Sequence, residues 1–303
     1  MKSTTKPRRA RSARSAAGKA NPKGRAREKA SAAVPGLQRL REVLRPYRKV
    51  VLAFSGGVDS TFLLAALCED PGREVLAVTA LSPTYPESQI EEARRLVGRF
   101  RSARHREIRT DELNLASFRN NPPDRCYHCK KELFSAILEI RDQEGYDVVL
   151  DGSNLDDLSD FRPGLKALEE LGVKSPLREA GLGKEQIRRL SRAMGLPTWN
   201  KPSFACLSSR FPYGTPITQE ALGRIERCEA FLAERVRGSI RVRCYGAMAR
   251  IEVDPAIFRT FLEEREAIVA YFKQQGFAYV TLDLEGYRTG SMNEVLFAKP
   301  SRS

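Results

Sequence analysis

The sequence predicts an α/β protein in which a doubly wound parallel sheet is followed by a smaller C-terminal α+β domain. Two observations support this prediction. Up to residue 196, short apolar runs alternate with helical segments, which is typical of a parallel sheet covered by helices on both faces. After a stretch rich in Pro and Gly at residues 197–217, the pattern changes to short alternating strands and longer helices.

The elements follow in order from the periodicity of apolar residues. In the first part, strands are expected at residues 50–54, 74–80, 105–109 and 146–150, and helices at 36–47, 87–100, 125–141, 164–171 and 184–194. In the second part, helices are expected at 220–235 and 255–275, and strands at 239–244, 249–253, 277–283 and 294–298. Ligands of such sheets bind at the carboxyl ends of the strands, so the segments that follow the first and fourth strands are the first candidates for function.

The positive charge of the chain is concentrated at its N-terminus. Residues 1–35 carry eleven Lys or Arg and one acidic residue, Glu28, and so hold +10 of the formal net charge of +14. Without aromatic residues, this segment cannot bury enough apolar surface to offset chain entropy, and it is expected to be a disordered basic tail. A solvated extension is favoured over a segment that contacts nucleic acid non-specifically. The rest divides at the connector, residues 197–217, into units at 36–196 and 218–303.

The cellular setting follows from cysteine content and hydropathy. Six cysteines in 303 residues do not make a disulfide framework. Neither a secretory signal nor an apolar run of transmembrane length appears in the sequence. A cytoplasmic enzyme without a membrane partner is therefore expected, and Cys68, Cys228 and Cys244 fit ordinary buried positions.

A glycine-rich turn follows the first strand and opens a helix. Its backbone N–H groups, with the positive end of the helix dipole, predict a phosphate-binding nest, in which a β-carbon at either glycine would hold phosphates at a distance. The turn lacks the Gly-Lys-Ser/Thr ending of a Walker loop. In its strand–helix setting, SGGVDS resembles the PP-loop of ATP pyrophosphatases, which makes 36–196 the ATP-binding domain. The expected ATP-binding residues are Ser55, Gly56, Gly57, Val58, Asp59 and Ser60, together with Asp151 after the fourth strand and Ser82 after the second.

Three cysteines form a second candidate site. Cys126 and Cys129 make a CxxC motif, and the prolines before it place both thiols in a first helical turn. There, the helix dipole and neighbouring basic residues favour thiolates. Alone, CxxC is equally consistent with a zinc half-site, a redox pair or chance. Cys206 lies in the connector, a long loop of the kind that carries reactive groups, and three cysteines on one iron–sulfur cubane would leave its fourth iron open.

Together, SGGVDS, DGSN, RCYHCKKELF and ACLSSRFPYG resemble the pyridinium-3,5-bisthiocarboxylic acid mononucleotide synthases, the LarE family, over about residues 36–298. The resemblance implies the fold of the adenine nucleotide alpha hydrolases. It also implies ATP-dependent sulfur transfer during synthesis of a nickel-pincer nucleotide cofactor. Members of one group give up the sulfur of a cysteine matching Cys206, which becomes dehydroalanine. Members of the other hold a [4Fe-4S] cluster on three cysteines, which match Cys126, Cys129 and Cys206 here.

The resemblance also implies roles for single residues. With ATP and Mg²⁺, the substrate carboxylate would be adenylylated, pyrophosphate would leave, and sulfur would replace the activated oxygen. The implied catalytic residues are Cys206, Asp59 and Lys130, with Lys131 as the alternative to Lys130, and Asp59 is equally consistent with a helix N-terminal acid. Arg210, Arg241 and Arg243 would bind the anionic substrate. The implied partners are a small nucleotide substrate, a sulfur-delivery system, a downstream nickel-insertion enzyme and further copies of the chain, such as a hexamer.

Other functions stay open from the residues alone. A tRNA thiolase of the same superfamily would activate a base oxygen instead of a carboxylate. However, the folded part carries only a small excess of positive charge, so nucleic acid is not expected as a partner. A nucleotide- or RNA-binding module without catalysis is a third interpretation, and an ammonia-using synthetase is a fourth.

Overall fold

A four-stranded parallel sheet organises the first part of the chain in this computed structural model, which describes residues 1, 34–159, 163–202, 204–288 and 290–297. The strands are β1 (Lys49–Ala53), β2 (Glu74–Leu81), β3 (Ala103–Arg109) and β4 (Val148–Leu150), in the order β3-β2-β1-β4. β1 is central: its residue Val50 pairs with Val75 on one side and Val148 on the other. The predicted parallel sheet is confirmed.

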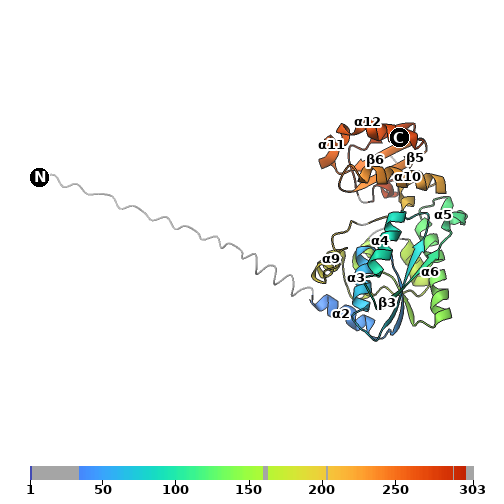
Figure 1. Cartoon of the computed structure of the whole chain (residues 1–303), viewed down its shortest axis with the longest axis vertical. Coiled ribbons are helices and arrows are strands. Elements are labelled where there is room, and N and C mark those ends of the chain that lie inside the picture. The colour runs from blue at the N-terminus through green and yellow to red at the C-terminus, as the bar shows by residue number, and fades with distance from the viewer. Residues whose placement is uncertain (2–33, 160–162, 203, 289, 298–303) are drawn as a thin grey trace.

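Helices cover both faces of this sheet (Figure 1). Side chains alternate between the two faces along a strand. Val50 and Leu52 therefore face a core that includes helix residues Phe62 and Ile187, while Val51 faces a second core that includes Ile137. The first face is covered by α2 (Val34–Leu44), α3 (Val58–Leu67), α4 (Glu87–Val97) and α9 (Lys184–Ala193), and the second by α6 (Arg125–Glu144) and α7 (Gly164–Glu170).

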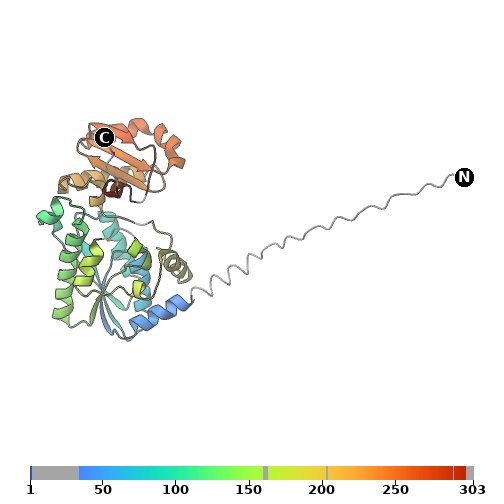
Figure 2. The same cartoon turned by 180° about the vertical axis from the view of Figure 1, so that it is seen from behind.

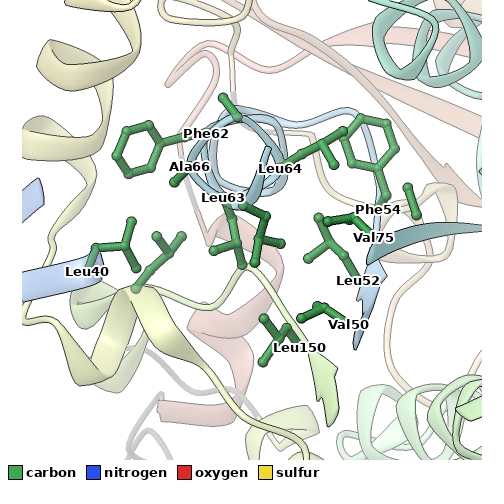
Figure 3. Close-up of a cluster of buried hydrophobic side chains, with 14 of the residues drawn as sticks. Leu40, Val50, Leu52, Phe54, Phe62, Leu63, Leu64, Ala66, Val75 and Leu150 are labelled. Atoms are coloured by element: carbon green, nitrogen blue, oxygen red, sulfur yellow. The ribbon is translucent and has the colours of Figure 1, made fainter. Parts of the chain in front are cut away.

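Helix α3 is the most deeply buried of these helices. Phe62, Leu63 and Leu64 are completely buried, and they point in different directions around the helix axis (Figure 3). A helix that is apolar all round is typical of a protein interior rather than a surface. This burial anchors the N-terminus of α3, and with it the loop that joins α3 to β1.

A second, smaller sheet forms the C-terminal unit, which lies at one end of the molecule (Figures 1 and 2). Strand β5 (Ile240–Tyr245) pairs antiparallel with β6 (Met248–Val253), and β7 (Tyr279–Leu282) pairs parallel with β6. The accompanying helices are α10 (Gln219–Ala233), α11 (Phe258–Glu263), α12 (Arg265–Gln274) and α13 (Glu294–Phe297). This arrangement confirms the predicted α+β composition.

The core of the C-terminal unit reaches beyond residues 218–303. Phe118, Leu207, Phe211 and Ile217 are buried in the same cluster as the side chains of α10, β5 and β6. Phe118 belongs to α5 (Ala116–Arg119), which precedes the CxxC helix α6. The connector residues Leu207 and Phe211 therefore join two parts of the chain by packing as well as by covalent continuity.

Two predicted elements differ in the structure. The strand expected at 294–298 is wrong, because Glu294–Phe297 forms helix α13; an apolar run as short as residues 295–298 does not distinguish a strand from one helical turn. The helix expected at 255–275 is interrupted at Glu264, where α11 ends and α12 begins. The predicted tail lies outside the described residues except for Met1, Val34 and Pro35, and no described helix is both long and apolar enough to cross a membrane.

Candidate active site

The loops that follow β1 and β4 meet at the carboxyl edge of the parallel sheet. Because β1 lies between β2 and β4, this edge contains the point where the chain direction across the sheet reverses, the usual ligand site of such folds. Gly152 of the DGSN segment lies so close to the SGGVDS loop that an added β-carbon would be 3.1 Å from the backbone nitrogen of Ser60. The two motifs therefore form one wall.

A cavity of about 340 Å³ opens beside this wall. Its volume lies within the range of small-molecule sites. Three lysines from different segments reach it, as do two residues of the connector, Pro202 and Phe204. The polar lining residues are Ser55, Asp59, Ser60, Thr79, Tyr85, Gln89, Lys130, Asp151, Ser153, Asp157, Lys184 and Lys201.

The first turn of α3 points its N–H groups toward this space. Gly57 is the N-cap residue, and no side chain caps the helix there. The Ser55 and Ser60 hydroxyls lie 3.2 Å apart, beside the same turn. Uncapped N–H groups at a helix N-terminus attract anions, so the predicted phosphate nest has the expected geometry.

Gly56 also meets a structural requirement that the sequence did not indicate. Its φ is +67°, and an added β-carbon would be 3.1 Å from both the Cα and the Cβ of Ala93 on α4. Glycine is therefore required for the left-handed turn and for close packing against α4. Gly57, in contrast, lines the cavity, as predicted.

Asp59 lies on the first turn of α3 and is half-buried. Burial raises its pKa, and the nearby charge of Lys184 opposes this rise. The Nζ of Lys184 is 2.5 Å from Oδ2 of Asp59, whereas Oδ1 is buried and has no hydrogen-bond partner among the described residues. Since Asp157 also faces the cavity, the two carboxylates are suited to hold a divalent cation.

Asp151 and Lys130 link the cavity to the CxxC helix. Asp151 is buried and accepts hydrogen bonds from the hydroxyls of Ser153 (2.5 Å) and Ser175 (2.6 Å). The Nζ of Lys130 lies 3.7 Å from its Oδ2. Gly164 leaves room for the lysine, because an added β-carbon would be 2.8 Å from Cδ of Lys130.

Of the two adjacent lysines considered, Lys130 alone lines the cavity. Lys131 is half-exposed and lies near the end of α7. Its Nζ donates to the Tyr127 hydroxyl at 3.1 Å and lies 4.0 Å from a carboxylate oxygen of Glu170. This position favours Lys130 as the candidate catalytic lysine.

Sequence reasoning missed Lys184 and Lys201. The Nζ of Lys201 donates to the carbonyl of Gly56 at 3.1 Å and to Glu92 at 2.7 Å. Its side chain is only 14% exposed, so the connector places a positive charge against the glycine-rich loop. Neither lysine belongs to a motif, and only the long-range fold reveals that they converge.

Cys126 and Cys129 occupy the N-terminal part of α6. Cys126 is in the first turn, but Cys129 begins the second turn, one residue further along the helix than predicted. The expectation that local charges favour a Cys129 thiolate is wrong. Burial raises its pKa well above the ordinary value, and the negative charges of Glu112, Cys206 and Cys126 add to this effect. Cys126 and Cys206 are therefore near enough to Cys129 to influence its ionisation.

The backbone around Cys206 is held from two sides. Leu207 N–H donates to the carbonyl of Thr84 at 2.8 Å. On the other side, Nη1 of Arg210 donates to the carbonyls of Ala205 (2.6 Å) and Cys206 (3.1 Å). Within the described residues, no group of three or more His, Cys, Asp or Glu side chains is arranged to hold a single metal ion.

Two of the three predicted substrate-binding arginines are buried in ion pairs. Arg210 is completely buried, and Nε and Nη2 donate to the carboxylate of Glu229 at 2.9 and 2.8 Å. Arg243 is bound by Glu252 at 2.6 Å and by the hydroxyl of Ser291. In this conformation neither guanidinium is exposed to a ligand, so the prediction of direct substrate contact is not supported for these two.

Arg241 is different, because it is half-buried beside aromatic rings. Its guanidinium lies 5.1 Å from the ring centre of Tyr287 and 5.9 Å from that of Phe204. Burial and the charge of Arg210 lower its pKa. Phe204 also lines the cavity, and the Arg210 guanidinium lies 5.3 Å from the same ring, so Phe204 separates both arginines from the cavity.

Ser82 does not line the cavity. It is buried and donates to Glu112, which also accepts from the hydroxyl of Thr84 at 3.0 Å. The structure therefore gives no support to the prediction that Ser82 binds ATP. Glu112 itself was missed, since nothing in its local sequence distinguishes it from a surface acid. The buried Glu112 carboxylate instead fixes the turn that ends at Tyr85.

Sequence comparison identifies proteins that are similar to this chain. The chain is 39% identical over 262 residues to an uncharacterised protein of Synechocystis, across 86% of this chain and 97% of that relative. It is 37% identical over 254 residues to the pyridinium-3,5-bisthiocarboxylic acid mononucleotide synthase of Lactiplantibacillus plantarum, across 84% of this chain and 92% of that relative. A weaker similarity relates the chain to the tRNA-specific 2-thiouridylase MnmA of Desulforamulus reducens. The identity is 26% over 196 residues, across 51% of this chain and 53% of that relative. No protein-family model matches.

The Lactiplantibacillus synthase is matched over nearly its whole length. The match therefore extends over most of this chain. It agrees with the resemblance that the four motifs indicated, and with the α/β fold observed here. The chain belongs to the pyridinium-3,5-bisthiocarboxylic acid mononucleotide synthase family.

Proposed function

We propose that this protein is an ATP-dependent sulfur transferase that converts a carboxylate of a pyridinium mononucleotide into a thiocarboxylate. The observation that carries the proposal is the shared wall of the cavity. The SGGVDS loop lies on one side, and Phe204, two residues before Cys206, lies on another. Activation by nucleotide and attack by sulfur would therefore take place in adjoining parts of one site.

The first step would make the carboxylate reactive. A carboxylate oxygen attacks the α-phosphorus of ATP, a P–O bond breaks, and pyrophosphate leaves, which gives an acyl-adenylate. The first turn of α3 would bind the pyrophosphate through its N–H groups. Lys130, Lys184 and Lys201 line the same cavity, and they would neutralise charge that develops on the phosphates.

Magnesium fits the carboxylates of this site. The unpartnered buried oxygen of Asp59 described above is an uncompensated acceptor, and Asp157 faces the same cavity. When bound there, Mg²⁺ would neutralise phosphate charge. Lys184 holds the other oxygen of Asp59, so it would keep that carboxylate oriented.

The second step would exchange oxygen for sulfur. A sulfur nucleophile attacks the acyl carbon, the bond from carbon to the AMP oxygen breaks, and AMP leaves with the thiocarboxylate formed. Cys126, Cys129 and Cys206 are the chain's own sulfur groups near this site. Lys130, next to Cys129 and 3.7 Å from Asp151, would stabilise the departing AMP phosphate.

In this proposal Cys126, Cys129 and Cys206 would hold a [4Fe-4S] cluster, because cysteine thiolates are the usual ligands of such clusters. Burial, the charge of Glu112 and repulsion from the neighbouring thiolates raise the pKa of Cys129, and a bound cationic centre would relieve this cost by taking up the thiolate. When bound, such a cluster would supply an iron without a cysteine ligand, which can hold an extra sulfide. If no cluster binds, Cys206 would give up its own sulfur and become dehydroalanine.

The wider setting follows from this chemistry. The product would pass to an enzyme that inserts nickel, and repeated turnover would need a sulfur-delivery system. Further copies of the chain, such as a hexamer, would complete the assembly. A tRNA thiolase is the rival function, because the distant relative MnmA is named as a tRNA-specific 2-thiouridylase.

One experiment separates these functions. Anaerobically purified protein is assayed with ATP and pyridinium-3,5-biscarboxylic acid mononucleotide for pyrophosphate release, thiocarboxylate mass and iron content. The variants Cys126→Ala, Cys129→Ala and Cys206→Ala are compared with Cys68→Ala, a cysteine at the far end of α3. We expect pyrophosphate only with the nucleotide substrate, and about four irons per chain lost in the first three variants alone.

The other outcomes are equally informative. Pyrophosphate release that requires tRNA would contradict the proposal in favour of the thiolase. Absence of iron, with a loss of sulfur from Cys206 after turnover, would retain sulfur transfer but replace the cluster by the sacrificial route.

A further inference from the structure

Asn121 occupies a strained and fully buried position between α5 and α6. Among the described residues, it is the one non-glycine residue with a positive φ, at 54°. Its exposed fraction is 0%. Asparagine tolerates the left-handed region better than most residues do, but such a conformation persists only where surrounding contacts enforce it.

The contacts of Asn121 use both ends of its side-chain amide. Its Nδ2 donates to the carbonyls of Pro212 (2.7 Å) and Phe211 (3.3 Å) in the connector. Its Oδ1 accepts from Nη1 of Arg125 at 2.9 Å. The backbone carbonyl of Asn121 accepts from Gly214 N–H at 2.9 Å. One residue is therefore bonded to the start of α6 and to the end of the connector.

These two segments are the ones that carry the three cysteines. Arg125 directly precedes Cys126, and Phe211 lies five positions after Cys206. A second contact supports the same junction, because the guanidinium of Arg125 lies 4.9 Å from the ring centre of Tyr213. The connector is thus fastened to the helix that carries the CxxC motif.

Two further contacts of the Cys206 loop go to other elements. Arg210 ties Cys206 to Glu229 on α10, and Thr84 ties Leu207 to the turn after β2. Neither contact involves α6. The Asn121 junction therefore contributes to the placement of Cys206 relative to Cys126 and Cys129, together with the Arg125–Tyr213 contact and the bond from Ile217 N–H to the carbonyl of Arg119 on α5 (2.8 Å).

We propose that Asn121 is a positioning residue that fixes the Cys206 loop against the CxxC helix, so that the three thiols act at one place. The inference rests on the proposed function, in which these thiols supply or hold the transferred sulfur. Asn121 itself touches neither nucleotide nor sulfur. Its conformational strain is balanced by hydrogen bonds whose geometry brings the two segments together.

The test measures thiol proximity directly. The full chain, with iron removed by chelation, is treated with dibromobimane, which bridges two nearby thiols, and the bridged peptides are identified by mass spectrometry. Asn121→Gly keeps the positive φ accessible but removes the amide, and Asn120→Ala is the control at the exposed neighbouring asparagine. An Ile225→Val or Ile225→Ala variant, chosen to match the melting temperature of Asn121→Gly, controls for general destabilisation.

We expect the yield of bridges between Cys206 and either cysteine of α6 to fall roughly tenfold or more in Asn121→Gly, since small displacements have large effects on reaction between positioned groups. The two controls should retain the wild-type yield. Iron per chain, measured on protein as purified, should fall in the same variant.

Two outcomes would overturn the proposal: wild-type bridging in Asn121→Gly, or an equal loss in the Ile225 variant. Failure of the proposed function is distinguishable. If wild-type protein forms the bridges but releases no pyrophosphate with the nucleotide substrate, the function fails and the positioning role stands. If pyrophosphate is released and bridging does not depend on Asn121, the proposed function stands and the positioning role fails.

Discussion

Replacement of Arg210 by Met should destabilise the protein strongly, because the guanidinium is fully buried and bonded to both oxygens of Glu229. The substitution leaves the Glu229 carboxylate, whose side chain is 13% exposed, without its countercharge. It also removes the Arg210 donor from the carbonyls of Ala205 and Cys206, of which Cys206 keeps the bond from Ser209 N–H. Breaking a buried pair on one side costs about 3–5 kcal/mol. At about 2–4 °C per kcal/mol, the melting temperature should fall by roughly 6–20 °C.

Thermal unfolding followed by circular dichroism measures this effect. Arg259→Met is the control, because Arg259 is 94% exposed and its pair with Glu263 should contribute about 0–1 kcal/mol. The double variant Arg210→Met with Glu229→Leu should recover much of the loss, since an apolar pair replaces the buried charges. If Arg210→Met melts like the wild type while its KM for the anionic substrate rises, Arg210 binds substrate and the structural assignment is wrong.

Three further predictions concern other parts of the molecule. Lys201→Met should raise the Kd for ATP, measured by titration calorimetry, roughly 10- to 100-fold by loss of a charge-assisted hydrogen bond. The Kd of the control variant Lys131→Met should be unchanged. Gly56→Ala should cost at least about 1–2 kcal/mol in urea unfolding, because its φ is +67°; Gly57→Ala, with a φ of −76°, should cost less. Asp147 accepts from the N–H groups of residues 48 and 49, which lowers its pKa. The ionised Asp147 therefore stabilises the fold fully above the unfolded-state pKa of about 3.9. This stabilisation is lost as the pH falls through the lower pKa of the folded state. The difference in melting temperature between wild type and Asp147→Asn should therefore vanish in strong acid.

The parallel sheet was predictable because its signal is local and repeated. Each buried strand is a short apolar run, and the SGGVDS turn marks where β1 ends and α3 begins. A strand such as β1 that is buried on both faces is typical of a parallel sheet covered by helices on each side. The CxxC helix was found for the same reason, since Arg125–Glu144 begins directly after two prolines and an aspartate.

The chemistry of individual side chains was less predictable, because it depends on partners that are distant in the sequence. The sequence suggested that Arg210 binds substrate, but in the structure its guanidinium is paired with Glu229 on α10. Lys201 reaches Gly56 across 145 positions, and no local pattern indicates that contact. The acidity of Cys129 was misjudged because nearby basic residues are visible in the sequence, whereas the burial of its thiol and the carboxylate of Glu112 are not.

The packing of Phe118, Leu207, Phe211 and Ile217 into the C-terminal core limits how this protein can be divided. A fragment that starts at residue 218 would lack all four side chains and would expose the apolar surface they cover. The complementary fragment would carry Phe118 without its neighbours. Separate expression of the two halves should therefore give insoluble material, and any dissection for crystallography or fusion needs an N-terminal boundary before α5 rather than inside the connector.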